Sequence, residues 1–115
     1  MDLRNTKANK KIVEKYLPGK YTLILKKKRK NFLKHVSPTE FIGVRIPNNN
    51  FCKIIQLSKV PFITTSVNIS GKPFAKSLKE INKEILNKVD VIIDAGKLSG
   101  KPSIIVFYDG KELKR

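Results

Sequence analysis

Hydroxyl and amide side chains gather in one short stretch of the chain, Pro61 to Phe74 (PFITTSVNISGKPF). Thr64, Ser66 and Asn68 can hydrogen-bond an anion, and Gly71 allows a tight bend through which backbone N–H groups can approach it. The same residue types also satisfy their own backbone in ordinary turns. The stretch therefore predicts either a cradle for a phosphate or carboxylate group, or a plain strand-to-loop transition.

A buried strand is expected to position these hydroxyl groups. The residues from Pro61 to Ser66 are β-rich, and Phe62, Thr64 and Ser66 would share one face of the strand. Side chains two apart in a strand lie about 7 Å from one another. Open α/β sheets bind ligands at the carboxyl ends of parallel strands, so this strand end is a candidate ligand site.

A second strand is predicted from Phe41 to Pro47 (FIGVRIP). Its alternation places Ile42, Val44 and Ile46 on one face and Arg45 on the other. Arg45 therefore points away from the most apolar face. Taken by itself, it is equally compatible with an exposed strand residue.

The rest of the chain interleaves helical and strand patterns. Periodicity predicts helices over residues 9–17, 51–58 and 78–89, and further strands over 21–27, 90–95 and 104–108. Three local signals accompany them: Asn48 to Asn50 as a helix cap, Ser77 with Glu80 as a capping box, and a turn at Asp109-Gly110. This order predicts one α/β domain over residues 1–115, with a mixed parallel and antiparallel sheet flanked by helices.

Composition limits the remaining chemistry. Cys52 is the single cysteine, with no spaced Cys and His partners for a metal site, so we expect a small core residue and no bound metal. His35 lies in a charged connection and is expected to face solvent. The sequence has no run of eighteen apolar residues and no apolar stretch typical of a signal peptide. We therefore expect a cytoplasmic protein without a membrane partner.

The net charge of +16 allows two interpretations. Clustered cations, led here by Lys26 to Lys30, are typical of proteins that bind tRNA or double-stranded RNA. However, Lys outnumbers Arg by 21 to 4, and Lys, Ile and Asn make up 44 of the 115 residues, as expected from an AT-rich genome. Selected phosphate contacts would favour Arg, so the charge alone does not decide between RNA binding and nucleotide composition.

Five segments together resemble one family. PFITTSVNISGKP is similar to the P-x-x-x-TSAN-x-SG-x-P signature of the YrdC-type threonylcarbamoyl-AMP synthases, the YrdC/Sua5/YciO-like domains. In order along the chain, YLPGKYTLIL, FIGVRIPNN, VDVIIDAG and SGKPSIIV resemble that family's W-P-G-P-x-T-x-x-L, V-A-V-R-x-P, D-x-I-I-D-x-G and G-x-x-S-T-x-V segments. The resemblance extends over about residues 15–110.

The resemblance implies a YrdC-like twisted mixed sheet flanked by helices, and a nucleotidyltransferase activity. Members of this family condense L-threonine, bicarbonate and ATP into threonylcarbamoyl-AMP and pyrophosphate, for the modification of adenosine 37 in tRNA. Carried over by position, Arg45 would pair with the threonine carboxylate, Thr64 would hydrogen-bond the threonine or its carbamate, and Ser103 would contact the same substrate.

The resemblance also implies an ATP site. Ser66, Asn68 and the backbone near Phe74 would face the ATP phosphates, and Mg²⁺ would be bound to those phosphates. The carbamate oxygen attacks the α-phosphorus, so the protein would mainly position two anions and neutralise their charge. No residue is assigned as a catalytic acid or base.

The family's N-terminal half has no counterpart in this sequence. Its P-T-E-T-x-Y-G-L and K-x-R-P segments are not found before Lys15. Val67 replaces the signature alanine, and Ile104 replaces a threonine, which removes a hydroxyl group beside Ser103. We therefore expect a C-terminal portion of the domain: one half of a split enzyme completed by a separate chain, a truncated gene product, or a shortened domain kept for binding.

Overall fold

The computed structural model describes residues 7–114, and the side chains of its first helix from Lys10 onward. The chain divides into two compact units. The sheet unit comprises Met1–Val60 and Pro102–Arg115, and the loop unit comprises Pro61–Lys101. The predicted single domain over residues 1–115 stays a prediction.

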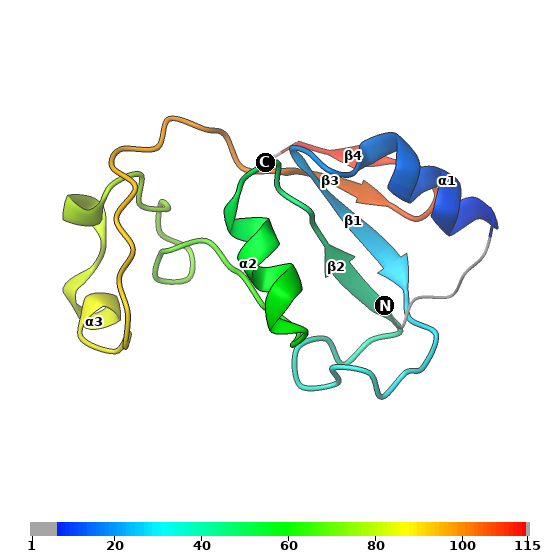
Figure 1. The fold of residues 1–115 in the computed structure, drawn as a ribbon, viewed down its shortest axis with the longest axis horizontal. Helices are drawn as coiled ribbons and strands as arrows, with labels where there is room; N and C mark the ends of the chain where they lie inside the picture. The colour runs from blue at the N-terminus through cyan, green and yellow to red at the C-terminus, as the bar shows by residue number, and fades with distance from the viewer. Residues whose placement is uncertain (1–6, 115) are drawn as a thin grey trace. The chain divides into compact units, whose positions relative to one another are not determined.

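Four strands of the sheet unit form one sheet: β1 Tyr21–Lys26, β2 Phe41–Val44, β3 Ile104–Phe107 and β4 Glu112–Leu113. Their order is β2-β1-β3-β4 (Figure 1). β1 pairs antiparallel with β2 and parallel with β3, while β3 pairs antiparallel with β4. The prediction of a mixed sheet with both kinds of pair is confirmed.

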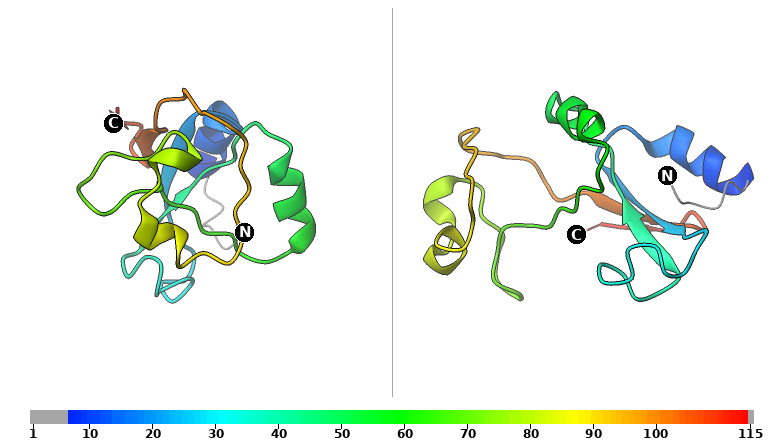
Figure 2. Two further views of the ribbon diagram at one scale, coloured as in Figure 1. Left: turned by 90° about the vertical axis from the view of Figure 1, so that its left-hand side faces the viewer. Right: turned by 60° about the horizontal axis from the view of Figure 1, so that its bottom comes forward.

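One helix covers one face of this sheet. Helix α1 (Lys7–Tyr16) ends before Pro18-Gly19 and packs against β1 (Figure 2). Leu23, Leu25 and Val106 have 0% of their surface exposed and form the centre of the core with Leu17. The apolar stripe of α1 lies against this cluster, which explains why a helix with a polar outer surface forms here.

A long loop and a tight turn connect the antiparallel strands. A loop over residues 27–40 links β1 to β2 as the hairpin that the sequence predicts, and His35 is exposed in it as expected. The turn predicted at Asp109-Gly110 links β3 to β4: the Gly110 amide donates to the Phe107 carbonyl, and Gly110 has φ +86°. The sequence does not predict β4, because a strand of two residues is too short to show an alternation of polar and apolar side chains.

Helix α2 (Phe51–Ser58) agrees with its predicted bounds, and its cap comes from the predicted Asn48 to Asn50 run. Asn50 makes no side-chain cap hydrogen bond, and Asn49 Oδ1 accepts from the Cys52 amide instead, at 3.2 Å. Within residues 7–114, α2 packs against none of the strands. Cys52 is therefore only half-buried, its thiol donating to the Pro47 carbonyl, and the expected core position is wrong.

The loop unit forms neither of the two strands predicted for it. Residues 61–66 and 91–95 are irregular, and Val91 and Ile93 expose 75% and 76% of their surface. Backbone groups form a strand only when a neighbouring strand pairs with them, and none is present within the described loop unit. The sequence of these segments favours strands, but no neighbouring strand in the described loop unit pairs with them.

The predicted helix over residues 78–89 is also wrong in extent. It is replaced by a 3₁₀ turn η1 (Leu78–Glu80) and a one-turn helix α3 (Lys83–Leu86). Asn82 interrupts the pattern, because its side chain accepts from the Glu84 amide at 2.7 Å and starts a new helix there. The predicted capping box does not form: Glu80 accepts from the Lys76 amide, and Ser77 makes no cap hydrogen bond.

Two features are absent from the described residues. No helix within residues 7–114 is both long and apolar enough to cross a bilayer. No group of three His, Cys, Asp or Glu side chains lies close enough to hold a metal ion in that same part of the chain.

Candidate functional site

The sheet unit presents a second face, opposite the core of Leu23, Leu25 and Val106. Strand alternation places Thr22 and Ile24 of β1 on this face. A Cβ on Gly43 of β2 would lie 3.5 Å from Thr22 Cγ2 and 3.6 Å from Ile24 Cδ1, so Gly43 leaves this part of the face shallow. Neither α1 nor α2 packs on it among the described residues.

Ser103 lies on this second face, at the start of β3. Its hydroxyl is 2.7 Å from the Thr22 hydroxyl across the parallel β1–β3 pair, and its residue surface is 4% exposed. Either hydroxyl of this pair can be the donor. Ser103 is thus part of a hydroxyl pair and not an isolated turn cap.

Arg45 follows β2 directly and continues the alternation of Phe41 and Gly43, which places it on the second face as predicted. It is exposed and forms no hydrogen bond or ion pair with any described residue. An exposed guanidinium without a partner retains all its donors for a planar anion. Arg45 and Ser103 therefore share one face of one sheet.

Thr22 is the residue that sequence reasoning missed. The sequence presents it as part of a β-rich run, although it stands at the threonine of the family's W-P-G-P-x-T segment. That motif position was the available signal. The cross-strand contact with Ser103 could not be read from the sequence, because the two residues are 81 positions apart.

Thr64 and Ser66 lie in the loop unit, in the irregular segment before the signature turn. Both are exposed, and neither forms a hydrogen bond with a residue in the described range. The strand that was expected to hold these side chains about 7 Å apart is absent, so strand geometry does not fix the distance between them. Their hydroxyl groups have no partner among residues 7–114.

Asn68 and Phe74 are brought together by a closed loop. The Ala75 amide donates to the Val67 carbonyl at 2.9 Å, so the two predicted residues occupy facing positions just inside the neck of this loop, and both are half-buried. Gly71 turns the loop with φ +78°, in the left-handed region that favours glycine. The Asn68 amide donates to the Ile69 carbonyl at 3.0 Å, which leaves its side-chain oxygen as an acceptor.

The six predicted site residues thus form two groups. Arg45 and Ser103 belong to the sheet unit, and Thr64, Ser66, Asn68 and Phe74 belong to the loop unit. The convergence of both groups on a common ligand stays a prediction.

Comparison with known proteins places this geometry in context. Residues 2–114 match the family model described as Telomere recombination, which covers Sua5, yciO and yrdC. A candidate threonylcarbamoyl-AMP synthase of Methanocaldococcus jannaschii is 47% identical over 98 residues, covering 84% of this chain and 45% of that protein. The uncharacterised protein YciO of Escherichia coli is 32% identical over 101 residues, covering 84% of this chain and 48% of YciO.

A solved structure agrees in fold. The structure of a Pyrococcus abyssi Sua5 variant with two alanine substitutions matches 93% of this chain and 34% of its own chain, with a TM-score of 0.77 and 27% identity. The chain spans about half the length of the curated M. jannaschii and E. coli relatives it matches.

Proposed function

The chain belongs to the YrdC/Sua5 family, and from this premise we propose that it is the C-terminal portion of a threonylcarbamoyl-AMP synthase domain. Its substrates are L-threonine, bicarbonate and ATP, and its products are threonylcarbamoyl-AMP and pyrophosphate. The product supplies the modification of adenosine 37 in tRNA. The name of the M. jannaschii relative, at 47% identity, supports the activity.

The observation that carries the proposal is the shared face of Arg45 and Ser103. Arg45 has no partner among the residues that the structure describes, and its fork of N–H donors matches the carboxylate of threonine. The Thr22–Ser103 hydroxyl pair lies on the same face and supplies further hydrogen bonds to the amino acid. Arg45 and Ser103 then hold threonine, while Thr64 hydrogen-bonds the carbamate formed on its nitrogen.

The loop unit carries the groups proposed to bind ATP. Ser66, the second side-chain N–H of Asn68, which does not donate to Ile69, and the backbone at Phe74 lie along one loop, where hydroxyls and N–H groups suit phosphate oxygens. Mg²⁺ enters with ATP as part of the substrate, since magnesium is commonly bound through substrate phosphates and water. The carbamate oxygen then attacks the α-phosphorus and pyrophosphate leaves, with positioning as the main source of rate.

We further propose that a polypeptide carrying the family's P-T-E-T and K-x-R-P segments completes this site. The chain spans 45% and 48% of two relatives. Large apolar side chains in the loop unit, such as Ile63, Val91 and Ile93, are exposed, and their burial by a partner would contribute favourable free energy.

The direct test measures pyrophosphate release from ATP with threonine and bicarbonate. We expect threonine-dependent release when the chain is mixed with the first half of the M. jannaschii relative, and at least about tenfold less from the chain alone, because positioning needs both halves. Omission of threonine is the control. Release that does not depend on threonine in either mixture would reject the proposed activity.

RNA binding is a second candidate function, and one observation favours it. The β1–β2 loop exposes Lys28, Arg29, Lys30 and Lys34, and the sequence contains no acidic residue between Lys26 and Thr39. The cluster differs from the Lys26 to Lys30 run that the sequence suggested. Lys27 is buried and Lys26 pairs with Glu40, so neither is free to bind phosphate.

Replacing these four exposed loop cations by Glu should weaken binding to double-stranded RNA. The slope of log K against log salt concentration should also become less steep by about 3 to 4, because fewer counterions are released when fewer phosphates are contacted. The control replaces four exposed lysines of the loop unit, Lys72, Lys76, Lys79 and Lys83, and gives the same change in net charge. Filter binding over a series of salt concentrations measures the affinity and its salt dependence for both variants. Equal losses from the two variants would show that net charge, and not this loop, binds RNA.

A further inference from the structure

Lys27 is buried at the end of the sheet. It follows β1 in phase with Leu23 and Leu25, and only 2% of its surface is exposed. A buried ammonium group is costly unless hydrogen bonds replace its hydration. The surroundings of this side chain must therefore supply polar partners.

Three backbone carbonyls supply them. Lys27 Nζ donates to the carbonyl oxygens of Lys30 at 2.9 Å, Phe32 at 3.2 Å and Ser37 at 2.9 Å. An ammonium group has three N–H donors, so each donor has one acceptor. The backbone N–H of Lys27 donates to the Glu40 carbonyl at 2.7 Å, which ties the same residue to the end of the loop. We call the three carbonyls the carbonyl cage.

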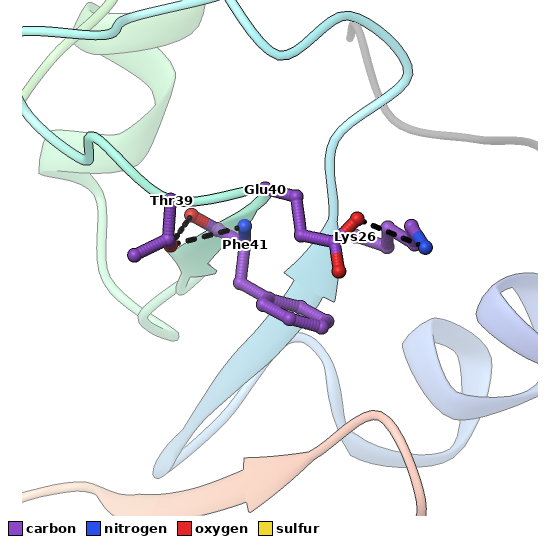
Figure 3. A network of polar contacts seen from close by, with 4 residues as sticks. All are labelled: Lys26, Thr39, Glu40 and Phe41. Carbon is purple, nitrogen blue, oxygen red and sulfur yellow. Dashed lines mark hydrogen bonds and ion pairs between the residues drawn. The ribbon is translucent and has the colours of Figure 1, made fainter.

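The carbonyl cage joins three separate points of the β1–β2 loop, at residues 30, 32 and 37. The loop's internal backbone hydrogen bonds are short-range turns, such as Phe32 to Arg29 and Ser37 to Leu33, and Leu33 has φ +48° in the left-handed region. At the loop ends, Lys26 pairs with Glu40 at 3.0 Å (Figure 3). Both side chains of that pair are partly exposed, and such pairs contribute little stability.

We propose that the carbonyl cage is a binding site for a primary ammonium ion, which the chain fills with its own Lys27, and that the conformation of the β1–β2 loop depends on this occupancy. Once the Lys27 side chain is truncated, the cage takes a small alkylammonium from solution. Propylammonium has three carbons and an ammonium group, which match the Cγ, Cδ, Cε and Nζ atoms that Lys27→Ala removes. Tetramethylammonium carries the same charge but no N–H donor, and it does not bind the cage.

Hydrogen exchange of the full chain tests this proposal. In Lys27→Ala we expect the loop amides of Phe32, Val36 and Ser37 to exchange at least about tenfold faster than in the wild-type protein. The reason is that the loop can then open locally without breaking three hydrogen bonds to Lys27. Propylammonium should restore most of this protection, and tetramethylammonium at equal ionic strength should not. Lys28→Ala, an exposed neighbour with the same charge change, should leave the loop amides unchanged.

Two further measurements keep the proposal testable if Lys27→Ala does not fold. Lys27→Met keeps an apolar stem without the charge, and should loosen the loop while the amides of β1 stay protected. In the wild-type protein, the ¹⁵N ammonium signal of Lys27 should exchange with water at least about tenfold more slowly than that of Lys28, since it is hydrogen-bonded and buried.

Equal loop exchange in the Lys27 and Lys28 variants, equal rescue by both ammonium salts, or a rapidly exchanging Lys27 ammonium signal would each overturn the proposal. None of these readouts involves ATP or threonine. A negative activity assay would therefore not contradict the proposal for the carbonyl cage, and a negative exchange experiment would not contradict the proposed activity.

Discussion

Arg45→Ala should weaken threonine binding to the completed domain by roughly 30- to 150-fold, which corresponds to about 2 to 3 kcal/mol. The reason is the proposed ion pair, in which a guanidinium without internal partners takes the threonine carboxylate. Arg45→Lys keeps the charge but loses the planar fork, so we expect an intermediate loss. Isothermal titration with threonine measures all three proteins.

The matched control is Arg29→Ala in the β1–β2 loop. It removes an exposed arginine and the same charge, and it should leave the threonine Kd within about twofold, as expected of surface substitutions away from a site. If Arg45→Ala and Arg29→Ala changed the Kd equally, the role of Arg45 as the carboxylate ligand would be wrong. The second face would then need another anchor for the amino acid.

Leu23→Ala should lower the free energy of unfolding by about 3 to 5 kcal/mol, as for other fully buried leucines. Leu23 has no exposed surface, and it lies at the centre of a core that comprises four buried hydrophobic residues in the described part of the chain. Since small domains have a total stability of about 5 to 15 kcal/mol, the loss is a large fraction of what is available. Urea unfolding followed by circular dichroism gives the value.

Ile24→Ala is the control for this prediction, because Ile24 is the next residue of β1 but lies half-buried on the second face. We expect less than half the loss of Leu23→Ala. Equal losses from the two variants would mean that the second face is as well packed as the core. That result would also argue against its use as a substrate surface.

The elements that could be predicted are those whose pattern and partner both lie in the sheet unit. β1, β2 and β3 were read from alternation and β-branched residues, and each has a neighbour in the sheet. Residues 61–66 and 90–95 have equally strong strand patterns but no partner within the loop unit. Periodicity describes what a segment prefers locally, whereas a strand also requires a second strand that the pattern does not describe.

Placement on the second face was predictable for Arg45, because strand alternation alone decides it. The Thr22–Ser103 contact was not, since it depends on which strands become neighbours. Lys27 shows a third case. The sequence presents it as one more cation of a basic loop, but the path of that loop brings three carbonyls around it. Nothing in the residue types of such a loop specifies that path.

The parallel pair of β1 and β3 has a consequence for synthesis of the chain. Leu23 of β1 is paired with Val106 of β3, so β1 cannot form this pair until the ribosome has translated the whole loop unit. At about 5 to 20 residues per second, the 81 positions that separate Thr22 from Ser103 take roughly 4 to 16 s. During that interval the nascent β1–β2 hairpin displays an unpaired edge to the ribosome surface and its chaperones, and a stop codon anywhere in the loop unit would leave that edge permanently open.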